Sequence, residues 1–218
     1  MALPEPFSTA SPILTNYNWQ DVAGGTGYIT FYCGSAYNET DGTTYNLSTH
    51  QTLSHTQGAW AYKDYRAGEN GVQRTINYDV KMNKNMAISG NVLIDHHYIL
   101  HEDNDNGSST GYFIFSLINY DGTTEKVLGT ADTEHFSLSE ETENVESTLI
   151  LNVEDKEVVS QGNILRLKVE FYISNGEYGY LGISLAVSPR GLEYEAYDEI
   201  MMTENTQLKV NIPFEIEG

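Results

Sequence analysis

Cysteine is almost missing from this sequence, because Cys33 is the only one in 218 residues. No disulfide can form within the chain, so its fold must be held by packing rather than by covalent cross-links. Cys33 ends the apolar run of residues 28–33, and a cysteine in such a run behaves as a small buried hydrophobe. We therefore expect a buried, unreactive thiol.

Positive charge is also scarce. The chain has 11 lysines and arginines against 31 aspartates and glutamates, a formal net charge of −20. Such a field repels phosphate backbones and anionic lipid surfaces, so we expect neither nucleic acid nor a membrane as partner. No run approaches the roughly 20 consecutive apolar residues of a membrane span. The first residues also lack the basic flank and apolar stretch of a signal peptide.

Helical periodicity is weak, and the dominant hydrophobic period is two. Apolar and polar residues alternate along residues 208–216, 165–173 and 76–82. This alternation predicts strands with one face on a core and the other in water. The run Tyr112–Ile118 is apolar at nearly every position, which indicates a central strand covered on both faces. Asn119–Thr123 supplies the turn residues of a hairpin.

Many short strands without helical crossovers favour two antiparallel sheets packed on one core. We therefore predict an all-β fold, an antiparallel two-sheet jelly-roll sandwich over residues 25–218, with an extended N-terminal arm over residues 1–24. Pro213 has no N–H for a sheet ladder, so its strand is expected at a sheet edge or bulged there.

The predicted arm contains three of the chain's five prolines, at positions 4, 6 and 12, and ends at the flexible pair Gly24-Gly25. Two interpretations remain open for it. One is a disordered terminus. The other is a latch onto a neighbouring subunit, because five large apolar side chains of the arm favour burial. These candidate partner-binding residues are Phe7, Ile13, Leu14, Tyr17 and Trp19.

Metal sites are suggested by two segments, and each has a simpler explanation. Asp95, His96, His97 and His101 are zinc-ligand types, but consecutive histidines on a strand point to opposite faces. Residues 103–107 resemble the start of a calcium loop, but its twelfth position, which needs a glutamate, is Ile114. We predict no metal and no cofactor.

Catalytic motifs are missing too. The sequence has no G-x-S-x-G elbow and no glycine-rich phosphate loop with lysine. The acidic stretch of residues 132–146 is expected to be a solvated loop. We predict that the chain is not an enzyme. Its sixteen tyrosines, and tryptophans such as Trp60, suit a carbohydrate platform or a subunit interface, but tyrosine also fits the outer face of strands.

Three segments carry a family resemblance: N-W-Q-D-V-A-G-G-T-G-Y-I-T-F-Y at Asn18–Tyr32, Q-G-N-I-L-R-L-K-V-E-F at Gln161–Phe171 and T-Q-L-K-V-N-I-P-F-E-I at Thr206–Ile216. With them the chain resembles the jelly-roll structural proteins of tailed-bacteriophage virions, the capsid decoration, cement or head-fibre class. The resemblance implies a non-enzymatic virion protein, made in the host cytoplasm, that lies on the capsid surface. It also implies a homotrimer that contacts the major capsid protein. The alternative is a carbohydrate-binding, lectin-like β-sandwich module.

Overall fold

A computed structural model describes the backbone of residues 15–16, 26–38, 42–49, 59–65, 71–103, 109–138, 142–175, 179–185 and 207–215. Side chains are described for 27–34, 44–49, 71–98, 110–136, 145–173 and 207–215. Every regular element in these ranges is a strand, which confirms the prediction of an all-β fold. They contain no helix long and apolar enough to cross a membrane.

The strands follow one another along the chain as follows: β1 Thr15–Asn16, β2 Thr26–Asn38, β3 Gly42–Ser48, β4 Ala59–Tyr65, β5 Gly71–Lys81, β6 Met86–Asp103, β7 Ser109–Tyr120, β8 Glu125–Asp132, β9 Phe136–Leu138, β10 Thr142–Val159, β11 Ile164–Asn175, β12 Gly179–Leu185 and β13 Leu208–Glu215. The predicted hairpin at residues 119–123 joins β7 to β8. The acidic stretch is not simply a loop, because Glu143 and Glu146 lie within β10.

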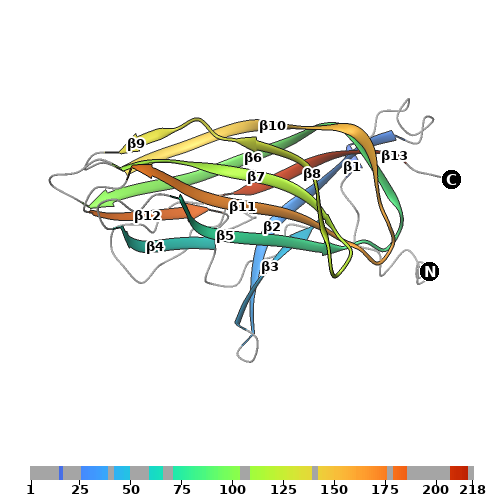
Figure 1. The fold of residues 1–218 in the computed structure, drawn as a ribbon, viewed down its shortest axis with the longest axis horizontal. Helices are drawn as coiled ribbons and strands as arrows, with labels where there is room; N and C mark the ends of the chain where they lie inside the picture. Colours follow the sequence, from blue (N-terminus) through green and yellow to red (C-terminus); the bar gives the residue numbers. More distant parts are fainter. Residues whose placement is uncertain are drawn as a thin grey trace, which may run out of the picture.

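The sheet is continuous, which differs from the expectation of two separate antiparallel sheets. Nine strands pair in the order β10-β6-β13-β2-β3-β5-β11-β7-β8. Strands β12 and β4 continue from the last part of β6, while β1 pairs with β2 and β9 with β7. All these pairs are antiparallel except β3 and β5, which meet in parallel at Asn46 and Asp79. In Figure 1 the hairpin of β2 and β3 projects from the body of long strands.

The sheet curls until its two outermost strands, β8 and β10, lie side by side. Lys126 on β8 pairs with Glu157 on β10 at 2.6 Å across the seam between these two strands. Next to it, the Asn119 side chain at the end of β7 donates to the Val158 carbonyl of β10 at 3.4 Å. A Cβ on Gly129 would lie only 2.6 Å from the Asn152 carbonyl oxygen. No hydrogen-bonded ladder joins β8 and β10 within the described ranges. The result is a nearly closed barrel.

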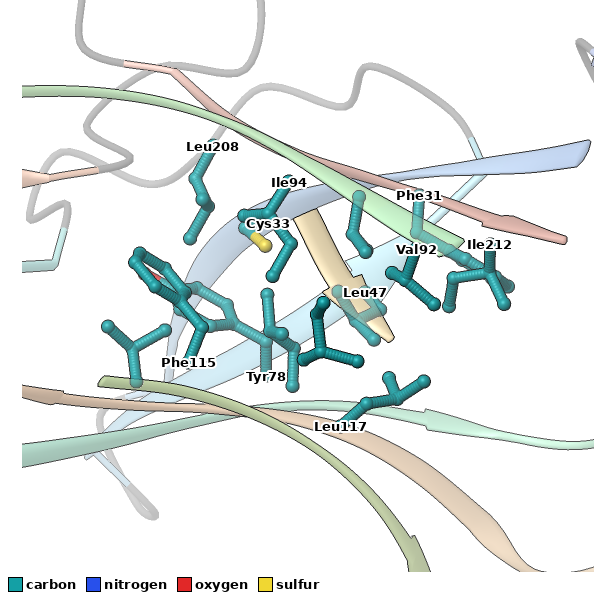
Figure 2. Close-up of a cluster of buried hydrophobic side chains, with 14 of the residues drawn as sticks. Phe31, Cys33, Leu47, Tyr78, Val92, Ile94, Phe115, Leu117, Leu208 and Ile212 are labelled. Carbon is teal, nitrogen blue, oxygen red and sulfur yellow. The ribbon is translucent and has the colours of Figure 1, made fainter. Parts of the chain in front are cut away.

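The interior of the curled sheet is filled with apolar side chains, as Figure 2 shows for part of the core. The alternating residues predicted to face inward do so, for example Leu165, Leu167 and Val169 in β11. Cys33 is fully buried, as expected. Burial raises the pKa of its thiol well above the ordinary value, because the thiolate is disfavoured away from water.

Strand β13 is central rather than at an edge, because it pairs with both β2 and β6. The alternative prediction of an irregular strand at Pro213 is correct. The ladder to β6 shifts register between Asn211 and Glu215, on either side of the proline. The proline therefore lies where the pairing with β6 is already interrupted, so its missing N–H removes no regular bond to that strand.

Candidate binding sites on the outer face of the sheet

Polar groups available to a ligand lie on the outside of this molecule. Within the described side chains, the buried polar residues are His96, Ser116 and Thr133, and the rest of the core is apolar. Since the interior is closely filled, a ligand can meet hydrogen-bonding groups on the outward faces of the strands.

One polar pocket of about 320 Å³ opens on the outer face of β6, β10 and β13. We call it the outer pocket. The strand registers place its side chains in two rows across the sheet, Thr148–Asp95–Lys209 and Glu146–His97–Gln207. His96 and Ser147, which alternate with these residues along β6 and β10, complete the lining. The pocket thus combines an ammonium group, two carboxylates, an imidazole, an amide and hydroxyls.

Asp95 is the centre of a hydrogen-bonded network in the outer pocket. Its Oδ1 accepts a hydrogen bond from Thr148 Oγ1 at 2.6 Å, and its Oδ2 lies 3.3 Å from Lys209 Nζ. Asn211 Nδ2 donates to the same Oδ2 at 3.2 Å, and Asn211 Oδ1 accepts from Thr30 Oγ1 at 2.6 Å. The network therefore links β10, β6, β13 and β2 and holds Lys209 and Thr148 in place.

His96 and His97 face opposite sides of β6, as the sequence predicted. The His96 ring is buried and stacks on Tyr98 and Phe115, with ring centroids 5.4 and 5.7 Å away. Its Nδ1 has no hydrogen-bond partner among the described residues. Burial lowers the pKa of His96 below 6.5, and the charge of Asp95 opposes this only in part. The described residues contain no group of three His, Cys, Asp or Glu side chains able to hold a metal.

An aromatic row lies on a different part of the outer surface, over β7 and β11. The rings of His135 and Tyr112 are parallel within 1°, with centroids 4.3 Å apart, and Tyr172 follows at 4.9 Å from Tyr112. Partial desolvation raises the pKa of the Tyr112 hydroxyl, with smaller contributions from Tyr172 and Asp132. The ring faces that Tyr112 shares with His135 and Tyr172 are therefore covered by these neighbours.

A third cluster, around Arg166, is structural. Its guanidinium makes a bidentate contact with Asp79, at 2.7 Å from Nε to Oδ1 and 2.8 Å from Nη2 to Oδ2. It also donates to Glu125 and lies 4.8 Å from the centre of the Tyr120 ring. The hydrogen bonds to Asp79 raise the pKa of Arg166 further. Asp79 and Tyr120 lie on β5 and β7, the two neighbours of β11, and Glu125 lies on β8 beyond β7, so the cluster ties β5, β11, β7 and β8 together.

The predicted partner-binding residues lie outside the described part of the chain. This applies to Phe7, Ile13, Leu14, Tyr17 and Trp19. Of the predicted arm, Thr15 and Asn16 are described, and they form β1 on β2 of the same chain. Residues 104–107 of the suggested calcium loop are also outside the described residues, and so is the side chain of Trp60, whose backbone lies in β4.

The outer pocket was missed at the sequence level. The sequence suggests Asp95 and His97 only as metal ligands, and it places Glu146 in an acidic stretch that resembles a loop. The outward positions of Gln207 and Lys209 follow from the alternation in residues 207–217. Which strands lie next to one another does not follow from that pattern.

No family model matches the chain, and no curated protein sequence is similar to it. Among solved structures it is similar to a CocE/NonD family hydrolase from Staphylococcus aureus, with a TM-score of 0.49, 11% identity and coverage of 88% of this chain and 37% of that chain. It is also similar to an aminopeptidase from a marine sediment Thaumarchaeota archaeon, with a TM-score of 0.48 and 9% identity. That match covers 86% of this chain and 37% of the aminopeptidase chain.

A chain from the structure of infectious bursal disease virus, Gt strain, gives a TM-score of 0.30, with 11% identity and coverage of 88% of this chain and 41% of that chain. Structural neighbours thus include viral chains as well as enzymes. This chain spans less than half the length of each of these three proteins. Likenesses of this size assign neither an activity nor a partner.

Proposed function

We propose that this chain is a non-enzymatic structural protein of a tailed-bacteriophage virion, with a jelly-roll fold, that decorates or cements the capsid exterior. In this proposal it acts as a homotrimer that contacts the major capsid protein, and residues 1–24 latch onto a neighbouring subunit. The filled apolar interior supports a structural role, because it leaves function to the outer surfaces.

The observation that supports subunit contacts best is a group of exposed apolar side chains on the two strands of the seam. Val127 on β8 is 56% exposed, and Ile150 and Val158 on β10 are 58% and 36% exposed. We call these three side chains the apolar edge, and their burial against another protein surface would be favourable because it removes apolar area from water. We expect this apolar edge to face a second copy or the capsid.

Capsid attachment can be tested with shells assembled from the major capsid protein of the same genome. Deleting residues 1–14 removes Phe7, Ile13 and Leu14 but keeps Thr15 and Asn16, which pair with β2. We expect the full chain to sediment with the shells and the deleted chain to stay in the supernatant with an unchanged melting temperature. Attachment that survives the deletion contradicts a latch through Phe7, Ile13 and Leu14, and a full chain that never attaches contradicts the capsid role.

The oligomeric state provides a separate test. Light scattering after size exclusion is expected to give about three times the chain mass of 24.4 kDa. Ile150→Asp places a charge on the apolar edge and is expected to shift the protein toward monomer, whereas Asp132→Asn, an exposed change on β8, is the matched control. A monomeric wild type at high concentration would contradict the proposed trimer.

The second candidate is a carbohydrate-binding, lectin-like module, and the outer pocket favours it. Polar pockets with both donors and acceptors suit hydroxyl-rich ligands. A glycan array probed with the intact protein tests this function. Binding to a defined set of glycans supports it, and the absence of binding across the array is evidence against it.

A further inference from the structure

We infer that the outer pocket is a binding site for a neutral saccharide. This inference rests on the carbohydrate-binding alternative and names the site and the ligand class. The outer pocket has a volume of about 320 Å³, which lies at the low end of the range of about 300–1,000 Å³ for ligand pockets. A mono- or disaccharide is therefore the appropriate size of ligand.

The lining residues match the needs of sugar hydroxyls, each of which donates one hydrogen bond and accepts others. Lys209 and the Gln207 amide group donate, while the Glu146 carboxylate and the Gln207 carbonyl accept. Lys209 has three N–H groups, and its contact with Asp95 leaves donors for a ligand. Hydrogen-bond donors and acceptors for sugar hydroxyls thus line the same pocket.

The pocket is preorganised by the bonds around Asp95. Its carboxylate is engaged by Thr148, Asn211 and Lys209, so it acts as a positioning residue rather than a direct ligand contact. Groups that are already fixed lose little conformational entropy when a ligand binds. The network therefore lowers the cost of binding a small ligand.

An aromatic side chain flanks the pocket. Tyr32 on β2 is opposite Lys209 in the ladder between β2 and β13. It faces outward, because its neighbours Phe31 and Cys33 are buried in the core. The carbon-bound hydrogens of a pyranose ring pack on such an aromatic side chain, which supplies the apolar contact that polar groups alone lack.

The charge balance of the site favours a neutral ligand. Asp95 and Glu146 outnumber Lys209, and the chain carries a net charge of −20. Sulfated, phosphorylated and carboxylated glycans are therefore repelled.

The aromatic row is a poorer sugar site than the outer pocket. His135 stacks on Tyr112 at 4.3 Å, and the Tyr172 ring lies 4.9 Å from Tyr112 at a tilt of 30°, so the rings cover part of one another's faces. A change at the exposed His135, on a different part of the outer surface, therefore serves as a control.

The test is a glycan array followed by calorimetric titration with glucose, galactose, mannose and N-acetylglucosamine. We expect Gln207→Ala, Lys209→Met and Tyr32→Ala each to weaken binding about tenfold or more, because each removes a direct contact. His135→Ala is expected to bind like the wild type. Thermal unfolding shows whether each variant is folded. Glu146→Gln is an exposed and nearly isosteric change, so it tests the same site without loss of packing, and we expect it to weaken saccharide binding too.

The possible results distinguish a wrong assignment of the pocket from a wrong assignment of carbohydrate binding. Binding that survives the changes at Gln207, Lys209 and Glu146, or that is lost in His135→Ala, overturns the assignment of the pocket while leaving carbohydrate binding in place. A preference for anionic glycans overturns the ligand class. Binding to no glycan overturns the carbohydrate-binding function itself, and the site with it.

Discussion

Substituting Gly129 with alanine tests whether the curled sheet really brings β8 and β10 into contact. A Cβ at this position would lie 2.5 Å from Leu151 Cδ2 and 2.6 Å from the backbone oxygen of Asn152. The Leu151 side chain is fully buried and has little room to move. The Asn152 carbonyl belongs to β10, which is paired with β6 at Asn91, so relief of the clash requires a shift of the strand.

The expected loss follows from two opposing effects. Inserting a methyl group into a tightly packed place costs about 1–3 kcal/mol. Alanine recovers about 0.5–1 kcal/mol relative to glycine in a strand, because the unfolded chain has less freedom to lose. Because the clash is with a backbone oxygen and a fully buried side chain, the packing cost lies in the upper part of its range, about 2–3 kcal/mol. The net destabilisation is then about 1–2.5 kcal/mol, and in a domain of this size each kcal/mol lowers Tm by about 2–4 °C.

Urea denaturation and thermal unfolding, both followed by circular dichroism, measure this loss. Asp132→Asn is the matched control, because it is a nearly isosteric change of an exposed side chain three positions away on β8, and we expect a change of about 0.5 kcal/mol or less. A Gly129→Ala variant as stable as the wild type would refute the reasoning. It would mean that β8 and β10 do not meet and that the sheet is open.

Three further predictions concern buried side chains. Because the pKa of His96 is lowered in the folded state, the unfolded chain binds a proton first as the pH falls below about 6.5, and the folded state loses stability down to the folded pKa. His96→Phe should therefore lose less stability than the wild type between pH 7.5 and 5.5 in urea titrations, and an identical loss would contradict this. The Tyr78 hydroxyl is buried without a hydrogen-bond partner among the described residues, so Tyr78→Phe should raise the free energy of unfolding by about 1 kcal/mol, whereas a clear decrease would reveal a missed partner. Cys33 should react with a thiol reagent such as Ellman's reagent only after unfolding in urea, and rapid labelling of the native protein would contradict its burial.

Features that depend on neighbouring residues were predictable from the sequence. The alternation in residues 165–173 and 208–216 identified β11 and β13 and most of their inward side chains. The turn after β7 is equally local. Asp121 Oδ1 accepts hydrogen bonds from the backbone N–H groups of Thr123 and Thr124, and Gly122 has a φ of 98°. These bonds lower the pKa of Asp121, because they favour its charged form.

Strand neighbours were not predictable. The expectation of two separate sheets missed the parallel contact of β3 with β5 at Asn46 and Asp79. Pro213 led to the expectation of an edge strand or a bulge, and the structure has the irregularity in a strand paired on both sides. Each of these features depends on residues far apart in the chain, and no local pattern encodes their pairing.

The outer pocket shows the same division. That Lys209 faces water was predictable from the alternation in residues 208–216, because a period of two is a property of a few consecutive residues. That Asp95, Thr148 and Lys209 meet in one row was decided by the register of β6 against β10 and β13. Sequence therefore determined which residues face water, and tertiary pairing determined which of them share a site, since register depends on the packing of the whole core.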